Sequence, residues 1–286
     1  KRMEALNEDI VLGMKYLYSN MPYSDVGNYT FDTYLDYVQQ GIYLWENSPY
    51  VKNYPELYFL NYVLFHRTND EEIKPCRTYF WKKIKDKVQG KAMVEAALEI
   101  NHWCAGEVMY QGTDMRTGSA LEIYRSGVGR CGEEAVFVVN VMRSAGIPAR
   151  PVYVPRWSHC DDNHAWVEVW CDGDWHYLGA CEPEAVLDKG WFTNAASRAM
   201  MIGSRWYDRA MPDEKVIGKD GMNRIINLLG KYAKTRWITI TVEDLDGTPA
   251  AGAKVRAEVM NYGEFSPIAI MEADKNGCIS FETGFG

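Results

Sequence analysis

An apolar helix that begins at a glycine-flanked cysteine and is followed by short strands constrains the fold of this chain most. The run of residues 135–143 after Cys131 is almost entirely apolar and stops at Gly146-Ile147-Pro148, so it predicts a buried helix. Beyond Pro148 the pattern changes to short strands, with Asp172-Gly173-Asp174 as a turn. The predicted strands cover residues 149–154, 164–170 and 175–178. We therefore expect an α+β fold in which this helix packs against an antiparallel sheet.

Cys131 is a candidate nucleophile because of where it lies in this pattern. Gly129 and Gly132 let the backbone bend closely around it. At a helix N-terminus the aligned peptide dipoles favour an anion, so we expect the pKa of the thiol to lie below the usual value of about 8.5. The alternative is a small buried hydrophobic residue, which is a common role for free cysteine.

His164 is the candidate base for that thiol. It opens the predicted strand at residues 164–170, whose alternate side chains point to opposite faces. A strand end can hold an imidazole rigidly, and a base within reach of a thiol is a general feature of nucleophilic catalysis. The two residues together suggest thiol chemistry.

The sequence around these two residues resembles the transglutaminase-like superfamily of papain-like thiol enzymes, and in particular its peptide:N-glycanase branch. Gly129-Arg130-Cys131-Gly132-Glu133 and His164-Ala165-Trp166-Val167-Glu168-Val169 carry the resemblance, which spans about residues 90 to 205. It implies a papain-like core, with Cys131 as nucleophile and His164 as base.

The third catalytic residue departs from the family pattern. The family has an aspartate a few positions after the tryptophan that corresponds to Trp175, and that place holds Gly179 here. Glu182 matches an acidic residue of the glycanase pattern and is the first candidate to replace the aspartate. The weaker candidates are Glu184, Asp172 and Asp174.

The function that this resemblance implies is thiol-dependent hydrolysis of an amide in a peptide, protein or glycopeptide, through a covalent thioacyl intermediate. The oxyanion donors would be the Cys131 backbone N–H and a second group from Trp103 or Gln111, with Trp166 at the substrate or in the core. The alternatives are a transglutaminase-type acyl transferase, a catalytically degenerate peptide- or glycan-binding protein, and a purely structural surface domain. We expect substrate choice to depend on the loops at residues 112–118 and 155–162.

Three regions are expected along the chain. Residues 1–90 form a helical N-terminal region packed on the core, residues 91–234 form the catalytic domain and end in a helix at Lys219–Lys234, and residues 235–286 form a β module. Strand alternation starts at Trp237, and hairpin-type turns are predicted at Asp246-Gly247 and Asn276-Gly277. This module resembles carboxypeptidase-regulatory-like or immunoglobulin-like sandwich domains of secreted and periplasmic proteins. Its four strands are too few to close a sandwich, so we expect the natural chain to continue.

Composition limits the setting and the partners. The net charge of −8 over 286 residues, without a cluster of Lys and Arg, argues against nucleic acid as a partner. No apolar stretch reaches the roughly 20 residues of a membrane-spanning helix, and no signal-like segment begins the chain. Seven cysteines without a CxxC or HxxxH pair predict neither a disulfide framework nor zinc, and no cofactor is expected. The resemblance of the β module implies a periplasmic, cell-surface or secreted location; the oligomeric state stays open.

Overall fold

The chain groups into two compact units, and each is described by itself. The computed structural model describes residues 7–112, 114, 116–221 and 223–286, so the first six residues of the predicted helical region lie outside the described residues. Unit 1 is the described part of Lys1–Pro151 together with Ala165–Gly190, and unit 2 is Val152–His164 together with Trp191–Gly286. The boundaries after residues 90 and 234 stay predictions.

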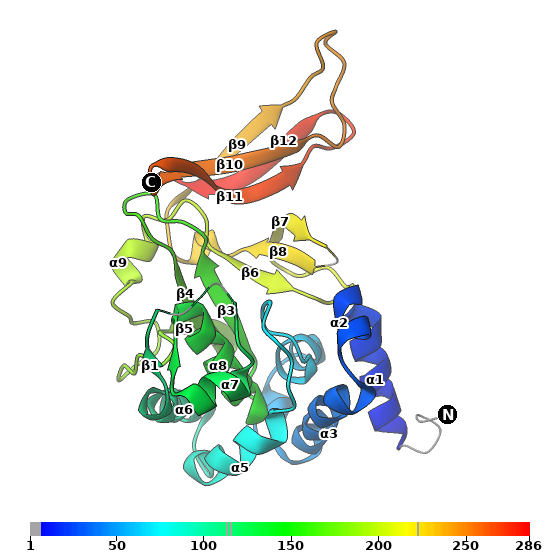
Figure 1. Cartoon of the computed structure of the whole chain (residues 1–286), viewed down its shortest axis with the longest axis vertical. Helices are drawn as coiled ribbons and strands as arrows, with labels where there is room; N and C mark the ends of the chain where they lie inside the picture. The colour runs from blue at the N-terminus through cyan, green and yellow to red at the C-terminus, as the bar shows by residue number, and fades with distance from the viewer. Residues whose placement is uncertain (1–6, 113, 115, 222) are drawn as a thin grey trace. The chain divides into compact units, whose positions relative to one another are not determined.

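Unit 1 is rich in helices, as the sequence predicted for its N-terminal part (Figure 1). Asn7 and Thr30 cap the first and third helices with their side chains, which accept the N–H groups of Asp9 and Thr33. In the described ranges, no helix is both long and apolar enough to cross a membrane. The helices are α1 (Glu8–Asn20), α2 (Tyr23–Asn28), α3 (Phe31–Asn47), α4 (Glu56–Phe59), α5 (Arg77–Val88), α6 (Met93–Glu107), α7 (Ala120–Ser126) and α8 (Cys131–Ser144), with a 3-10 turn at Val51–Asn53 and a π turn at Leu60–Leu64.

Helix α8 lies at the centre of unit 1. Every residue of α8 from Glu133 to Ser144 is buried, including the apolar run 135–139. Helices α5, α6 and α7 all pack against it. The predicted buried helix is thereby confirmed, and it holds Cys131 at its first position.

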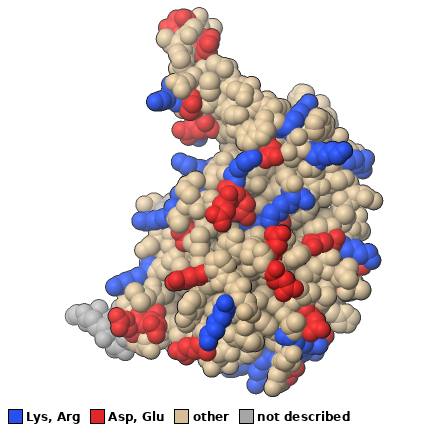
Figure 2. Space-filling view, turned by 180° about the vertical axis from the view of Figure 1, so that it is seen from behind, with Lys and Arg blue, Asp and Glu red and all other residues tan. Residues whose placement is uncertain are grey.

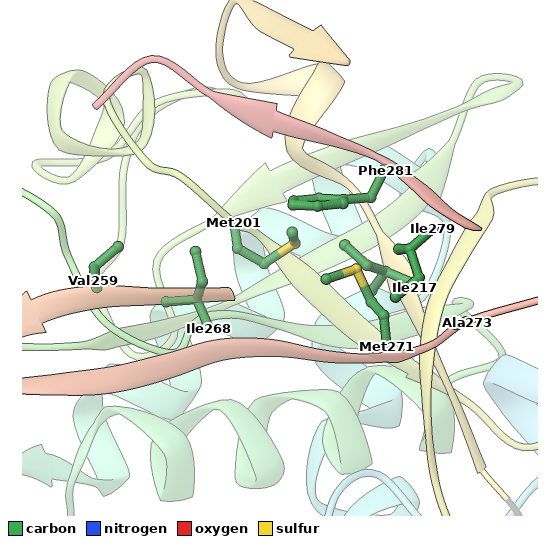
Figure 3. Close-up of a cluster of buried hydrophobic side chains, with 8 residues drawn as sticks. All are labelled: Met201, Ile217, Val259, Ile268, Met271, Ala273, Ile279 and Phe281. Carbon is green, nitrogen blue, oxygen red and sulfur yellow. The ribbon is translucent and has the colours of Figure 1, made fainter. Parts of the chain in front are cut away.

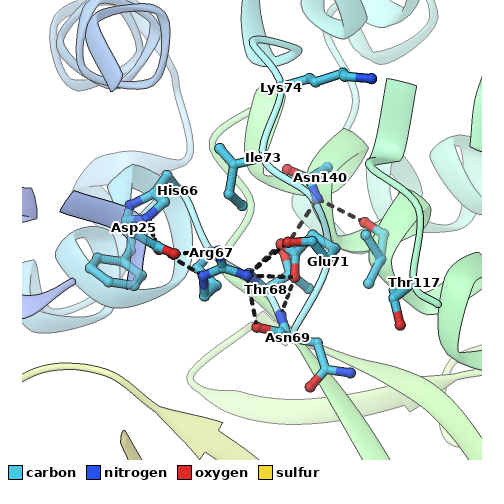
Figure 4. A network of polar contacts seen from close by, with 12 residues as sticks. Asp25, His66, Arg67, Thr68, Asn69, Glu71, Ile73, Lys74, Thr117 and Asn140 are labelled. Carbon is cyan, nitrogen blue, oxygen red and sulfur yellow. Dashed lines mark hydrogen bonds and ion pairs between the residues drawn. The ribbon is translucent and has the colours of Figure 1, made fainter. Parts of the chain in front are cut away.

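Buried polar contacts join the N-terminal helical region to α8. Arg67 Nε and His66 Nε2 each donate to the Asp25 carboxylate, at 2.7 and 2.9 Å (Figure 4). From α8, Asn140 Nδ2 donates to Thr68 Oγ1 at 3.2 Å. All five of these residues are buried, so each polar atom in these bonds exchanges water for a protein partner. The region before the predicted catalytic domain is therefore part of the same packed unit as the cysteine helix.

The strands that follow α8 agree with the sequence pattern. They are β3 (Ala149–Val154), β4 (His164–Cys171) and β5 (Asp174–Leu178). β4 and β5 are antiparallel, with Val167 opposite Leu178, and the turn between them has positive φ at Asp172 (52°) and Gly173 (93°). Two positive φ values are typical of the type I′ turn that joins paired strands. Ahead of α8, β1 (Met109–Tyr110) and β2 (Val128–Gly129) form a short parallel pair.

A hairpin replaces the final helix that was predicted at Lys219–Lys234, so that prediction was wrong. Unit 2 contains α9 (Thr193–Ala196), β6 (Gly203–Trp206), β7 (Lys215–Asp220), β8 (Asn223–Asn227) and a 3-10 turn at Leu229–Lys231. β8 pairs with β6 on one side and with β7 on the other, all antiparallel. Gly221 takes a φ of 60° in the turn between β7 and β8, and Gly218 of β7 lets another strand approach, because a Cβ there would lie 2.7 Å from the Ile270 carbonyl oxygen. Close backbone approach of this kind requires glycine, which also weakens a helix.

The last four strands are β9 (Thr235–Thr241), β10 (Lys254–Asn261), β11 (Glu264–Glu272) and β12 (Cys278–Gly284). β9 pairs with β12 and β10 with β11, both antiparallel. The predicted turns at Asp246-Gly247 and Asn276-Gly277 are present, with Gly247 N–H donating to Asp244 O at 2.9 Å and Gly277 N–H to Asp274 O at 3.0 Å. Asp246-Gly247 lies between the bridged antiparallel residues Glu243 and Pro249, and Asp274 N–H donates across the second turn to Cys278 O at 2.9 Å. A further hairpin turn, Tyr262-Gly263, joins β10 and β11 and was not predicted. An immunoglobulin-like fold for these strands stays a prediction.

An apolar cluster fills the interior of unit 2 near these strands (Figure 3). It combines side chains from β10, β11 and β12 with Met201 and with Ile217 of β7. The C-terminal strands therefore share their core with residues that precede position 235. The cluster consists of Met201, Ile217, Val259, Ile268, Met271, Ala273, Ile279 and Phe281.

Charged side chains of both signs are interspersed on the face of the molecule seen in Figure 2. Acidic and basic residues alternate there without a broad basic field.

Candidate active site

Cys131 is the first residue of α8, directly after β2 and Arg130. The Glu133 side chain, one turn into the helix, accepts the backbone N–H of Arg130 at 3.2 Å and that of Gly118 at 3.1 Å. These bonds fix the turn that precedes the helix. The Cys131 side chain is half-buried, so the turn presents it at the edge of the core and not inside it.

Burial raises the pKa of the Cys131 thiol above its ordinary range. Three groups act in the opposite direction: the backbone N–H groups of Gly132 and Ala165, which donate to the sulfur, and the positive charge of Arg130. The expected lowering of this pKa was wrong, because the loss of water around the thiolate outweighs the helix N-terminus. At neutral pH the resting group is therefore the thiol.

His164 belongs to unit 2, where it is buried with 6 % of its surface exposed. Its ring packs against Trp191 and Phe192, with centroids 4.7 and 5.0 Å away. Burial lowers the pKa of this imidazole to about 4, and the nearby Asp162 only partly offsets that effect. The imidazole is therefore neutral near pH 7, which is the form that can accept a proton.

The Glu182 carboxylate lies over Gly179, in the place where a side chain on residue 179 would begin. The two residues form an isolated antiparallel bridge, with Glu182 N–H donating to Gly179 O at 3.2 Å. A Cβ added to Gly179 would lie 2.8 Å from Glu182 Cβ and would overlap its carboxylate. Glycine at position 179 is thus what makes room for the glutamate.

Asn101 of α6 holds this turn, and the sequence reasoning missed it. Its Nδ2 donates to Gly179 O at 2.9 Å, and its Oδ1 accepts the Cys181 N–H at 3.1 Å. Cys181 has a positive φ of 57°, which is unusual for a residue with a side chain. The sequence contained a signal for this role. Asn101 lies on the buried, apolar face of α6 with Ala97 and Ile100, and a buried polar side chain needs a hydrogen-bond partner.

Glu134 is a second residue that the sequence reasoning missed. It lies one helical turn after Cys131 and is 4 % exposed. Burial, followed by the negative charges of Glu182 and Glu133, raises the pKa of its carboxyl to about 8. Near pH 7 Glu134 is therefore mostly protonated beside the turn that carries Glu182.

The other predicted site residues occupy different surroundings. Gln111 is exposed, and its backbone N–H donates to Gly129 O at 2.9 Å, which places it beside the turn before Cys131. Trp103 is partly buried and stacks on Tyr124 with centroids 6.0 Å apart. Trp166 is fully buried in the core of unit 1. The direct roles of these three residues at a substrate stay predictions.

Of the weaker candidates for the third residue, Glu184 and Asp174 have local partners and Asp172 lies in a turn. Glu184 pairs with Lys189 Nζ at 2.8 Å, and Asp174 Oδ1 accepts the N–H of Trp175 at 2.7 Å. Asp172 takes the first positive-φ position of the β4–β5 turn. Of the loop at residues 112–118, Thr113 and Met115 lie outside the described residues. Within the described ranges, no group of three or more His, Cys, Asp or Glu residues is arranged to hold a metal ion.

Comparison with models of protein families gives a match over part of the chain. The model of the transglutaminase-like superfamily matches residues 82–180. A sequence search of curated proteins gave no significant match. The glycanase branch and the immunoglobulin-like module are not tested by these findings and stay predictions.

Solved structures also show similarity, at low TM-scores. A candidate cysteine protease from Cytophaga hutchinsonii is 18% identical, with 53% of this chain and 57% of that chain covered and a TM-score of 0.32. Legionella pneumophila LapG is 17% identical, with coverages of 39% and 66% and a TM-score of 0.32. Red sea bream transglutaminase is 12% identical, with coverages of 98% and 59% and a TM-score of 0.38. The chain thus spans less than two thirds of each of these proteins.

The matched segment contains the helix that begins at Cys131 and the strand that begins at His164, and it ends before Glu182. Residues 82–180 of this chain thus match the transglutaminase-like superfamily over the segment that holds both Cys131 and His164.

Proposed function

We propose that this protein is a thiol-dependent amide hydrolase that acts on a peptide, protein or glycopeptide. Cys131 is the nucleophile, His164 the base and Glu182 the orienting acid. One observation carries the proposal: the N–H of Ala165 donates to the Cys131 sulfur, and Ala165 directly follows His164. Since consecutive Cα atoms lie about 3.8 Å apart, this bond ties the backbone at His164 to the vicinity of the thiol.

In the first half of the reaction, the Cys131 sulfur attacks the amide carbonyl and the His164 imidazole takes the thiol proton. The S–C bond forms, the C–N bond breaks, and the imidazolium returns the proton to the leaving amine. Water then attacks the thioester, the S–C bond breaks, and a carboxylic acid and the free thiol result. Every proton that leaves Cys131 or water passes through His164.

The resting protonation states decide when the proton moves. Burial raises the pKa of Cys131 and lowers that of His164 to about 4, so both groups are neutral at pH 7. A preformed thiolate–imidazolium pair is therefore disfavoured. The proton transfers as the sulfur attacks, in the way that a serine hydroxyl is activated by a histidine base.

Glu182 supports this role through its position over Gly179. The family places an aspartate at that position, and here the carboxylate that fills the corresponding space comes from three residues further along the chain. The Asn101 side chain bonds to the backbone of Gly179 and Cys181 and so fixes the backbone that leads to Glu182. The acid is therefore relocated rather than lost.

Gln111 is our candidate for the second oxyanion donor. Its backbone N–H, directly after β1, donates at 2.9 Å to the carbonyl of Gly129, which lies two residues before Cys131, and its side chain is exposed. Removing one such donor from an enzyme typically costs about 3 kcal/mol of transition-state stabilisation.

The test combines hydrolysis of a panel of fluorogenic peptide and glycopeptide amides with site-resolved alkylation of Cys131. We expect Cys131→Ser and His164→Ala to abolish turnover. Glu182→Ala should lower kcat strongly, and the double change Gly179→Asp with Glu182→Ala should recover part of it, because the new carboxylate enters the vacated space. Absence of turnover in the unaltered protein, with a Cys131 that reacts only in denaturant, would refute the enzyme.

Two other functions are separated by the same assays. A catalytically degenerate binding protein is favoured by the raised pKa of Cys131, and it would bind peptide or glycan equally well with Cys131→Ser without any covalent intermediate. A transglutaminase-type acyl transferase would pass the acyl group to an added primary amine faster than to water. Mass spectrometry of the products distinguishes the new amide from the acid.

A further inference from the structure

The β10–β11 hairpin ends in a tight turn of two residues. Asn261 and Glu264 are the last paired residues, and only Tyr262 and Gly263 lie between them. Their φ values are 53° and 77°, the pair of positive values that a type I′ turn requires. A tyrosine is seldom found at positive φ, so contacts outside the hairpin are needed to hold it there.

Those contacts are made by the loop at residues 155–163, which belongs to the same unit. The Asn261 side chain is completely buried, and its Nδ2 donates to the carbonyl oxygens of Trp157 at 3.0 Å and Cys160 at 2.8 Å. The carbonyl of Asp162 lies at 3.5 Å from the same nitrogen. One amide from a distant hairpin thus donates to two carbonyls of the loop and lies close to a third.

A second bond comes from the turn itself. The backbone N–H of Tyr262 donates to Asp161 Oδ1 at 2.7 Å. The loop also closes on itself, because Trp157 N–H donates to Asp162 O at 2.9 Å. The hairpin bonds therefore act on the same residues that close the loop.

This loop leads directly into His164, since Asp162 and Asn163 are the two residues before it. Within the same unit, the ring of His164 is set by Trp191 and Phe192, while the backbone that approaches it is set by Asn261. Leaving a buried carbonyl without its donor costs free energy, so these hydrogen bonds stabilise this geometry of the loop.

We propose that Asn261 is a positioning residue for His164: the β10–β11 hairpin holds the 155–163 loop so that the imidazole keeps its catalytic place. This inference rests on the proposed function, which gives His164 its role. It gives a part in the chemistry to the C-terminal strands, which the sequence predicted as a separate β module.

The decisive variant is Asn261→Asp. It has nearly the same shape but replaces the donating NH2 by an oxygen that faces three carbonyl oxygens. The matched control is Asn227→Asp, because Asn227 Nδ2 also donates to a backbone carbonyl of the C-terminal strands, that of Glu282 at 2.9 Å, without touching the loop. Asp161→Ala is a milder variant that removes only the bond from Tyr262 and alters an exposed residue.

Two readouts are needed on the full chain. Hydrogen exchange, followed by mass spectrometry of the peptides that cover residues 155–165, reports on the loop alone. Turnover and iodoacetamide alkylation of Cys131 report on the site. For Asn261→Asp we expect loop exchange to rise and kcat to fall by at least about tenfold, with KM changed less, and Asp161→Ala to change both in the same direction but less. Asn227→Asp should leave loop exchange and kcat near those of the unaltered protein.

The outcomes separate this inference from the proposed function. Unchanged loop exchange in both Asn261→Asp and Asp161→Ala overturns the inference. Faster exchange with kcat and alkylation like those of Asn227→Asp also overturns it, because the bonds would then serve only stability. If the unaltered protein shows no turnover and no dependence of alkylation on His164, the proposed function fails and the positioning role with it, while the exchange data still show whether Asn261 orders the loop.

Discussion

Replacing Glu134 by glutamine should make the protein more stable in a way that depends on pH. Glu134 is 4 % exposed, and burial together with Glu182 and Glu133 raises the pKa of its carboxyl to about 8. In the unfolded chain the same group ionises near the ordinary glutamate pKa of 4.5. The folded state therefore holds this proton more tightly, so its contribution to stability is full below the unfolded pKa and is lost as pH rises through about 8.

The magnitude follows from the two pKa values. Above the unfolded pKa, each pH unit removes up to about 1.4 kcal/mol from the free energy of unfolding, and the slope levels off near the folded pKa. Between pH 6 and pH 8 the loss attributable to Glu134 is about 2 kcal/mol. Glutamine carries no charge at any pH and retains the size of the side chain, so the variant lacks this loss.

Urea unfolding at pH 6, 7 and 8, followed by tryptophan fluorescence, measures the difference. The gap in unfolding free energy between Glu134→Gln and the unaltered protein should widen by about 2 kcal/mol over that range in favour of glutamine. Val138→Ala is the matched control, since it opens a cavity on the same buried helix without a titratable group and should shift stability equally at each pH. Parallel stability profiles for Glu134→Gln and the unaltered protein would refute the raised pKa.

Three more predictions concern unit 1. Asn101→Ala should cut kcat while the fold remains, because the Gly179–Glu182 turn loses its side-chain bonds; far-ultraviolet circular dichroism with steady-state kinetics checks both parts. The rate of Cys131 alkylation against pH should give an apparent pKa above the usual value of about 8.5 in the native protein and fall to it in urea, whereas a lower native value would contradict the burial argument. Glu168→Ala should destabilise the protein by about 3–5 kcal/mol in urea titrations, because it leaves the buried Arg150, which donates from Nε at 2.7 Å, without that carboxylate.

The sequence predicted the elements whose signals are local. The apolar run after Cys131 and the alternating strands at residues 149–154, 164–170 and 175–178 have patterns that their own residues carry, and the structure confirms them. The helix expected at residues 219–234 failed because Gly221 turns the chain between β7 and β8, and β8 also pairs with β6, a partner outside the segment that its own pattern does not reveal. Pairing of β9 with β12 was equally beyond reach, since it joins residues about 40 positions apart.

The site was predictable in its residue types but not in its electrostatics. The glycines and the histidine strand drew attention to Cys131 and His164, yet the direction of the thiol pKa depends on how much water the folded chain removes from the sulfur. Glu182 was chosen by resemblance, and only the folded turn shows its carboxylate over Gly179. Asn261 gave no such hint, because its partners lie about 100 residues away in the chain.

Each of the two units is made of two separate chain segments, and this limits where the protein can be truncated. Unit 2 includes residues 152–164, which leave unit 1 at the middle of β3 and return to it at the start of β4. Expression of the family-matched segment 82–180 alone would keep Cys131 and His164 but remove Phe192, Trp191 and Asn261. No single linker divides the two units. A recombinant fragment, domain swap or fusion that ends near residue 190 would therefore separate residues 152–164 from the rest of unit 2.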